Sequence, residues 1–264
     1  MGSQGRNEIM AAVYSFWGRG LDRQSLWRWT QGLPAALADI LLPSSCALCG
    51  DQCKGVLCDP CRQQYTQPRR RCVQCANPLA DHEPVDRCGA CIAATPAYDA
   101  TVAAVDYAAP FDALALQLKF GAQLALASMC AQLVRDAMLA RAPLALPDVL
   151  CPVPLGPRRL AGRGFNQALE IARPLGRLLG VPVQARWVTR PRDTPAQSTM
   201  TPVARKLNVR RAFVIEADVE GLHVGVVDDV MTSGNTLHEV ARMLKRAGAV
   251  RVTNLVFART PPHD

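Results

Sequence analysis

The sequence predicts an α/β protein in which a parallel sheet is preceded by a small cysteine-rich module. Candidate strands and helices alternate over the second half of the chain, which is typical of βαβ units and a parallel sheet. Nine of the 11 cysteines fall between Cys46 and Cys91, ahead of that alternating pattern. We therefore expect three parts: an N-terminal arm over residues 1–43, the cysteine-rich module over 44–95 and the α/β domain over 96–264.

The composition is that of a folded protein that does not cross a membrane. Of the 264 residues, 49% are hydrophobic and 20% are charged, which argues against long disordered tracts. The longest apolar runs fall far short of the roughly 20 residues that a membrane-spanning helix needs. The first residues are not followed by the apolar core and cleavage site of an export signal. We expect a soluble protein without a membrane span that works in the cytoplasm.

Eight cysteines form four pairs in which two residues separate the thiols. Two thiolates spaced in this way can bind one tetrahedral zinc ion, and a second pair completes the shell. Adjacent pairs would form two four-cysteine sites, an interleaved pairing would use the same ligands differently, and the sequence leaves both open. Disulfides are disfavoured in a reducing cytoplasm, and no thioredoxin-like βαβ unit surrounds the pairs. We predict structural zinc held by Cys46, Cys49, Cys58, Cys61, Cys72, Cys75, Cys88 and Cys91.

Three cysteines remain outside the predicted zinc shell, and one histidine lies between its ligands. Cys53 and His82 lie among the cysteine pairs, and we interpret both as bystanders. Cys130 falls in a helical pattern and Cys151 in a strand pattern, so both are expected to be small buried side chains.

The hydrophobic periodicity predicts the remaining elements in order. An apolar stripe at near-helical spacing in residues 26–41 predicts an arm that packs on the body. Gly121 separates two helical patterns, and Gly180 and Gly248 follow two others, as helix-ending glycines do. Short valine-rich runs predict strands. The expected strands cover residues 101–105, 149–153, 186–189, 212–215, 223–227 and 250–258, and the expected helices cover 111–120, 124–139, 166–179 and 235–247.

A buried-type strand followed by two acids, three hydroxyls and a glycine carries the strongest chemical signal. The strand delivers Asp228 and Asp229 to the carboxyl edge of the sheet, where ligands of α/β proteins bind. The hydroxyls of Thr232, Ser233 and Thr236 then accompany the backbone N–H groups of a helix start, which favours a phosphate monoester. The acids would repel a phosphate unless they face vicinal sugar hydroxyls or Mg²⁺. The pattern therefore predicts a site for a 5-phosphorylated ribose and exceeds what helix capping alone explains.

Basic side chains are concentrated between residues 151 and 213. This stretch holds twelve lysines and arginines against two acids, in a chain with a net charge of +8. Such a stretch can meet a polyanion such as pyrophosphate or a nucleic-acid backbone. A solvated arginine-rich face is the alternative interpretation.

The segment 224–236 resembles the phosphoribosyl-pyrophosphate (PRPP) motif of type I phosphoribosyltransferases. The match holds at the acid pair and at the hydroxyls and glycine of the loop, whereas Gly225 and Asn235 depart from the usual pattern. The resemblance implies the type I phosphoribosyltransferase fold, PRPP with Mg²⁺ as ligand, and Asp228 and Asp229 as catalytic residues. It also implies substrate contacts from Val230, Met231, Thr232, Ser233, Gly234, Asn235 and Thr236.

The order of motifs over residues 41–258 is similar to that of the ComF family of competence-associated proteins, in which a double zinc ribbon precedes such a domain. One family signature matches residues 152–155 and 163–167. A second signature matches Arg192, Thr194, Gln197, Arg205, Asn208 and Phe213. The resemblance implies a mobile hood over residues 186–211. It implies that pyrophosphate binds near Lys119, which matches a family position, or near Arg158 or Arg163, in the segment that stands where the wider fold has its pyrophosphate loop.

Two functions are expected from this resemblance. The first is phosphoribosyl transfer, a pentosyl-group transfer in which a nitrogen base or an amine displaces pyrophosphate from PRPP. The alternative is a non-catalytic protein that keeps PRPP recognition and binds single-stranded DNA during uptake, with proteins of the competence machinery as partners. Phe165, Trp187 and Phe213 are the candidate aromatic platforms for DNA bases, although stacking usually uses several. The sequence assigns no general base and no acceptor-recognition pocket.

Overall fold

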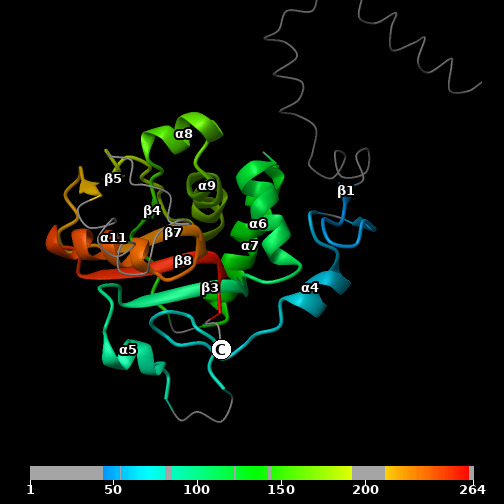
Figure 1. Cartoon of the computed structure of the whole chain (residues 1–264), viewed down its shortest axis with the longest axis horizontal. Helices are drawn as coiled ribbons and strands as arrows, with labels where there is room; N and C mark the ends of the chain where they lie inside the picture. Colours follow the sequence, from blue (N-terminus) through cyan, green and yellow to red (C-terminus); the bar gives the residue numbers. More distant parts are fainter. Residues whose placement is uncertain are drawn as a thin grey trace, which may run out of the picture.

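The computed structural model describes residues 44–53, 55–80, 85–121, 123–141, 144–191 and 212–261. Its centre is a four-stranded parallel sheet with the order β3-β8-β7-β4 (Figure 1). The four strands are β3 (Ala100–Asp106), β4 (Val149–Pro152), β7 (His223–Met231) and β8 (Arg251–Arg259). The predicted parallel α/β sheet is therefore confirmed. The arm predicted over residues 1–43 lies outside the described residues.

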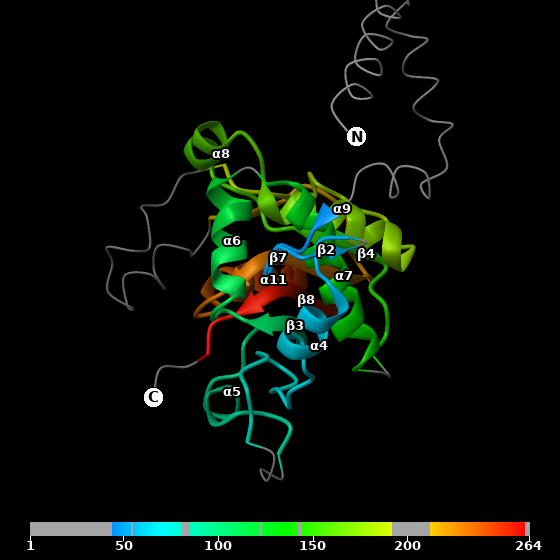
Figure 2. The ribbon, with the colours of Figure 1, turned by 90° about the vertical axis from the view of Figure 1, so that its right-hand side faces the viewer.

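Helices cover both faces of the sheet. On one face α7 (Ala125–Leu139) and α9 (Gln167–Leu179) pack together, and α11 (Asn235–Arg246) packs on the other (Figure 2). Helix α6 (Phe111–Phe120) lies beside α7. Each face has its own apolar core, because each helix turns an apolar stripe toward the sheet. None of the described helices combines the length and the apolar surface that crossing a bilayer requires.

Strand β7 is longer than the sequence predicts and includes the acid pair. The expected strand ends at residue 227, whereas β7 continues to Met231, which pairs with Arg259 of β8. The extension depends on the backbone of β8, a partner that the local pattern of polar residues does not reveal. Asp228 and Asp229 therefore sit on a central strand and not on a loop. Successive side chains of a strand point to opposite faces, so the two carboxylates leave β7 in different directions.

Residues 157–163 form a short helix, α8 (Pro157–Arg163), where the resemblance implies a pyrophosphate loop. Pro157 stands in the first turn, where its fixed φ suits a helix start. Gly164 ends the helix with a φ of 82°. The helix is too short for its periodicity to be detected in the sequence, although both end signals are present. Arg159 and Arg163 lie one turn apart on the same face of this helix, whereas Arg158 points away from that face.

The cysteine-rich module packs directly against the α/β domain. The first ribbon (residues 44–65) consists of a hairpin, β1 (Ser44–Ser45) and β2 (Gln52–Cys53), followed by α4 (Asp59–Tyr65). The second ribbon (residues 71–93) ends with α5 (Gly89–Ala93). Arg62 of the first ribbon pairs with Asp136 of α7 at 3.1 Å, and Arg71 of the second pairs with Asp106 at the end of β3 at 2.7 Å. The ribbons therefore share ion pairs and core with the domain that follows them.

Gly225, one of the two departures from the PRPP motif, fills a position with no room for a side chain. An ideal Cβ atom there would lie 2.7 Å from Leu150 Cδ2 and 2.8 Å from Pro147 Cγ. A bulkier residue is usual in the motif, and here Leu150 and Pro147 occupy the space that it would need. The departure is therefore a matter of packing between β7 and β4 and removes no polar group from the loop.

Replacing Gly225 by Ala is expected to lower the free energy of unfolding by about 1–3 kcal/mol, because overpacked cores cost this much. Urea denaturation followed by circular dichroism measures the change. Gly162→Ala in α8 is the matched control, since a Cβ there meets nothing within 4 Å. That control should leave the stability unchanged or raise it slightly. Equal effects of the two substitutions would contradict the close packing at Gly225.

Candidate functional site

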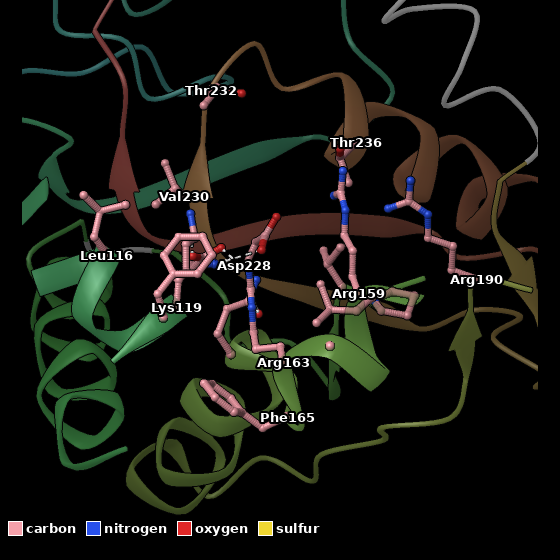
Figure 3. A pocket seen from close by; sticks show the side chains of 17 residues that line it. Leu116, Lys119, Arg159, Arg163, Phe165, Arg190, Asp228, Val230, Thr232 and Thr236 are labelled. Atoms are coloured by element: carbon pink, nitrogen blue, oxygen red, sulfur yellow. Dashed lines mark hydrogen bonds and ion pairs between the residues drawn. The ribbon is translucent and has the colours of Figure 1, made fainter. Parts of the chain in front are cut away.

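The two acids of β7 lie at the bottom of a cavity of about 730 Å³. Both Asp228 and Asp229 line it, together with Val230, Thr232 and Thr236 from the same motif. The carboxyl ends of β4 and β7 form its floor, as expected for ligand sites of open α/β sheets. Figure 3 shows the Asp228 side chain facing Lys119 of α6 and Arg163 of α8.

A chain of polar contacts holds Asp229 in place. Its Oδ2 lies 2.9 Å from Lys119 Nζ, contributed by α6. Its Oδ1 accepts a hydrogen bond from Gln167 Nε2 at 3.5 Å, and Gln167 Oε1 in turn accepts from Arg163 Nη1. The Asp229 side chain is only 5% exposed, so this network supplies the partners that a buried carboxylate requires. Three segments distant in sequence, around Lys119, Gln167 and Asp229, thus meet at one carboxylate.

Asp228 differs from its neighbour in having no basic partner at hydrogen-bond distance among the described residues. Its Oδ1 accepts from the backbone N–H of Asp229 at 2.9 Å. Burial at the bottom of the cavity, followed by repulsion from Asp229, raises the pKa of Asp228 well above its usual range. A cation bound beside the pair would lower that pKa again, because an opposite charge favours the ionised form. The protonation of the Asp228 carboxyl group is therefore expected to change when a charged ligand binds.

The loop after β7 leads into the start of helix α11 and lines a small hollow. Residues 232–234 connect β7 to α11, and together with the first two residues of α11 they are called the 232–236 loop. The first N–H groups of α11 have no partner within the helix. Gly234 has a φ of 78°, which non-glycine residues rarely adopt, and its ideal Cβ would lie 2.7 Å from Met231 Cε. Thr232 and Ser233 are exposed at a small hollow lined by residues 230–237 and Asp228. The loop therefore presents N–H groups and hydroxyls toward that hollow.

Among the described residues, four basic side chains line the cavity around the acids. Lys119 and Arg163 were selected from the sequence, and the structure places both in the lining. Arg159 and Arg190 also line it, whereas Arg158, the third predicted pyrophosphate residue, is absent from the lining (Figure 3). Neighbouring positions on a helix point about 100° apart, so α8 turns Arg159 inward and Arg158 elsewhere. The sequence offered no means of choosing between them without knowing that the segment is helical.

An apolar wall with an exposed aromatic ring lies on the α6 side of the cavity. Phe120, which no sequence pattern marks as a site residue, is 73% exposed and lines the cavity with Leu116 and Phe165. The guanidinium carbon of Arg163 lies 5.1 Å from the centroid of the Phe120 ring, within cation–π range. The wall therefore offers a flat apolar surface next to charged groups.

Asn166 begins helix α9 and orients the residue that follows it. Its side-chain oxygen accepts from the backbone N–H of Ala168 at 3.0 Å, and its side-chain nitrogen donates to the Val153 carbonyl at 3.0 Å. This cap places Gln167, which is 6% exposed, against Asp229. Gln167 belongs to the family signature, but no sequence pattern predicts its contact with Asp229.

The eight predicted zinc ligands form two separate groups of four, so adjacent pairs share a site. The sulfur atoms within each group lie within 4.8 Å of one another. The sulfurs of Cys49 and Cys58 are 3.6 Å apart, and those of Cys75 and Cys88 are 3.5 Å apart. A tetrahedral ion with bonds of about 2.3 Å requires edges of roughly 3.8 Å. The groups are Cys46, Cys49, Cys58 and Cys61, and Cys72, Cys75, Cys88 and Cys91.

Backbone N–H groups prepare one thiol in each group to act as a thiolate. Burial opposes ionisation of Cys46, but N–H donors within its own group outweigh burial and lower its pKa to about 6. The same balance lowers the pKa of Cys72 to about 7. Zinc binds the thiolate form. The distances within the two cysteine groups therefore support structural zinc.

The three cysteines outside the groups are described by the structure, whereas most of the expected hood is not. Cys53 is outside both four-cysteine groups, and its thiol donates to the Gly55 carbonyl at 3.2 Å. Cys130 and Cys151 are buried, as predicted. His82 and residues 192–211, which include most of the hood, lie outside the described residues. The short strands β5 (Val188–Thr189) and β6 (Val214–Ile215), which flank residues 192–211, pair with each other.

Comparisons with known proteins agree with both parts of the architecture. Residues 163–262 match the model of the phosphoribosyl transferase domain, and residues 37–92 match that of the double zinc ribbon domain. The purine phosphoribosyltransferase of Pyrococcus horikoshii is 20% identical, with a TM-score of 0.30, over 53% of this chain and 75% of that one. The sheet and the domain match together give the α/β part its phosphoribosyltransferase-type fold.

Relatives of similar length extend the comparison to most of the chain. The DNA utilization protein YhgH of Salmonella typhimurium is 37% identical over 207 residues, which cover 77% of this chain and 90% of that protein. Competence protein F of Haemophilus influenzae is 31% identical over 213 residues, covering 78% and 91%. Competence protein ComFC of Bacillus subtilis is 31% identical over 113 residues, covering 42% and 45%. The chain therefore belongs to the ComF family of competence-associated proteins, with a phosphoribosyltransferase domain behind a double zinc ribbon.

Proposed function

We propose that the cavity binds PRPP with Mg²⁺ and that the protein transfers the phosphoribosyl group to a nitrogen nucleophile with release of pyrophosphate. One observation carries the proposal. The acid pair of β7 and the 232–236 loop open toward a cavity that is also lined by four basic side chains of the part of the chain that the structure describes. A ligand that carries a sugar between two phosphate groups needs acids flanked by anion-binding groups.

The ligand is assigned to the cavity group by group. The 5-phosphate binds the N–H groups and hydroxyls of the 232–236 loop, at the positive end of the α11 dipole. The ribose hydroxyls face Asp228 and Asp229. The pyrophosphate binds near Lys119 and Arg163. A contact between Arg158 and the pyrophosphate stays a prediction, and the neighbouring Arg159 lines the cavity.

The donor atoms in the cavity suit a hard divalent cation. Carboxylate oxygens are ligands that Mg²⁺ prefers. Burial and then repulsion from Asp229 raise the pKa of Asp228, and a cation bound between the two carboxyl groups would lower it. Mg²⁺, when bound, neutralises part of the charge of the pyrophosphate.

The proposed reaction is a displacement at the anomeric carbon. The lone pair of the nucleophile nitrogen forms a bond to C1 of the ribose, and the bond between C1 and the pyrophosphate oxygen breaks. Its electron pair leaves with pyrophosphate, and the proton of the nitrogen passes to solvent. Asp228 and Asp229 stabilise positive charge that develops on the sugar, while Lys119 and Arg163 stabilise the leaving group.

An assay of pyrophosphate release tests this function. PRPP and Mg²⁺ are offered with a panel of nitrogen bases and amines, with and without single-stranded DNA. We expect release that depends on one class of acceptor. Measurable PRPP binding without release for any acceptor would contradict catalysis and leave recognition in place. Absence of PRPP binding by calorimetry would contradict the proposal as a whole.

The second candidate function is binding of single-stranded DNA. It is favoured by the exposed Phe120 ring beside Arg163 at the mouth of the cavity, an arrangement on which a base can stack. The relatives are named for DNA utilization and for competence. Of the aromatic residues chosen from the sequence, Phe213 is buried, whereas Phe165 lines the cavity and Trp187 is half-buried.

Titration of a single-stranded oligonucleotide at several salt concentrations tests the DNA-binding candidate. Binding through basic side chains should weaken with salt, with a slope of roughly −0.7 per phosphate contact in a log–log plot. Phe120→Ala should weaken binding by about 1–3 kcal/mol, the usual contribution of one stacked base. Leu139→Ala, at an exposed residue on α7, is the control. A flat salt dependence would argue against this function.

A further inference from the structure

One buried arginine joins the second zinc ribbon to the 232–236 loop. Arg259, the last residue of β8, is 6% exposed. Its Nε donates to the carbonyl oxygen of Cys75 at 3.0 Å, and its Nη1 donates to that of Met231 at 3.1 Å. Nη1 also donates to the Thr232 carbonyl. Cys75 belongs to the second four-cysteine group, and Met231 and Thr232 lead into the loop.

A second set of contacts joins the same two parts. Gln74, between two cysteines of the second group, donates to the Tyr98 carbonyl at 3.1 Å. The buried Tyr98 packs under the loop, where an ideal Cβ on Gly234 would lie 3.1 Å from its hydroxyl oxygen. The backbone N–H of Ala97 donates to His238 Nδ1 of α11 at 3.0 Å. The linker after the second ribbon therefore supports the loop from below.

The Arg259 contacts constrain the backbone more strongly than neutral hydrogen bonds do. Burial lowers the pKa of Arg259, but an arginine remains charged in proteins. A buried charge requires its acceptors, and hydrogen bonds from charged donors are about twice as strong as neutral ones. The carbonyls of Cys75, Met231 and Thr232 must therefore keep their positions relative to one another.

The first ribbon has no comparable connection among the described residues. It packs against α7, where Arg62 reaches Asp136 and Gln132. Its buried cysteines belong to the core on the α7 side of the sheet, whereas three cysteines of the second group belong to the core on the α11 side. The two metal sites are therefore not equivalent with respect to the loop.

We propose that Arg259 is a positioning residue through which the second four-cysteine site, when it holds zinc, sets the conformation of the 232–236 loop. The inference rests on the proposed function in one respect, that the loop binds the 5-phosphate. The proposal predicts that the two four-cysteine sites affect the 232–236 loop differently. Loss of metal from the second site weakens phosphate binding at the loop, and loss from the first site does not.

Arginine variants test the positioning role in the full-length zinc-loaded protein. Arg259→Met keeps the length of the stem and removes every donor, and Arg259→Lys keeps the charge and a donor head. Ribose 5-phosphate, which lacks pyrophosphate, is the probe in calorimetry. We expect about tenfold weaker binding for the methionine variant, equivalent to roughly one hydrogen bond from a charged donor, and partial recovery for the lysine variant. Arg251→Met, at the opposite end of β8, is the matched control and should bind normally.

Cysteine variants test the connection to the metal. Cys58 and Cys88 occupy equivalent places, each half-buried and each preceding the short helix of its ribbon. Cys58→Ser and Cys88→Ser should each lose about one of two zinc ions in native mass spectrometry. Hydrogen exchange of peptides covering residues 231–237, measured without ligand, should become faster in Cys88→Ser and in Arg259→Met only. Peptides from residues 223–227 of β7 serve as the internal reference.

Three outcomes would overturn the inference. The first is unchanged loop exchange in Arg259→Met, and the second is an equal effect of Cys58→Ser and Cys88→Ser on the loop. The third is faster hydrogen exchange to the same extent in the loop peptides and in the β7 reference peptides of all variants, including Arg259→Lys, because this would mean general destabilisation. If wild-type protein does not bind ribose 5-phosphate, the proposed ligand is wrong, yet exchange of the unliganded loop still decides the positioning role.

Discussion

Replacing Asp229 by Asn is expected to weaken PRPP binding about a hundredfold, while inorganic pyrophosphate binds as well as before or better. Asn keeps the shape of the side chain and removes its charge. The lost interactions are those of a carboxylate with ribose hydroxyls, on the scale of two charge-assisted hydrogen bonds or about 3 kcal/mol. Pyrophosphate has no ribose and therefore does not depend on this carboxylate.

The opposite response of pyrophosphate follows from the ion pair at the site. Lys119 Nζ lies 2.9 Å from Asp229 Oδ2 in the wild type. Without the carboxylate of Asp229, the ammonium group loses its ion-pair partner and becomes a stronger site for an incoming anion. A variant that had merely lost its fold would bind neither ligand, so the two probes separate a local effect from unfolding.

Calorimetry with Mg²⁺-PRPP and with pyrophosphate measures both affinities, and thermal denaturation reports stability. Removal of one partner of a buried ion pair is expected to cost some stability as well. Asp218→Asn is the matched control, because Asp218 is exposed on the segment that leads into the same strand. Retained PRPP affinity in Asp229→Asn would show that Asp229 does not hold the ribose. Lys119→Met in the same background should remove the gain for pyrophosphate.

The parts of the site that could be predicted from the sequence are those that lie close together along the chain. Asp228, Asp229 and the 232–236 loop are contiguous, so a short pattern of acids, hydroxyls and one glycine was sufficient to identify them. The four cysteine pairs are local in the same sense, but only folding shows that adjacent pairs share a metal site. Helix boundaries are also set by local patterns and could be predicted: α6 spans residues 111–120, as expected.

The contacts that could not be predicted depend on segments far apart in sequence. Gln167 reaches Asp229 across 62 positions, and Arg259 reaches Cys75 across 184. No local pattern marks either residue, because their roles come from the order of the strands in the sheet. The choice of Arg159 over Arg158 depends on the rotation of α8, a helix too short to show periodicity. Lys119 was found only through resemblance to the family.

Removal of both zinc ions is expected to lower the unfolding temperature of the protein by about 20 °C, in a single transition. Zinc at a thousandfold excess over its dissociation constant stabilises a protein by roughly 4 kcal/mol per site. Two sites contribute about 8 kcal/mol, and each kcal/mol shifts the unfolding temperature by roughly 2–4 °C in a chain of this size. Calorimetry with and without a chelator, together with zinc analysis, measures the change. Cys53→Ser, outside both groups, is the control and should keep two zinc ions.

The reason for expecting one transition, and not a separate melting of the ribbons, is that the cysteines belong to the cores of the α/β domain. Cys72, Cys75 and Cys91 pack in the same cluster as Val224 and Leu237, on the α11 face of the sheet. Without metal, each group would leave four thiols within 4.8 Å of one another, where ionised thiols repel. Loss of the ribbons then exposes one side of each core. An unchanged main transition after chelation would instead show that the sheet is stable without them.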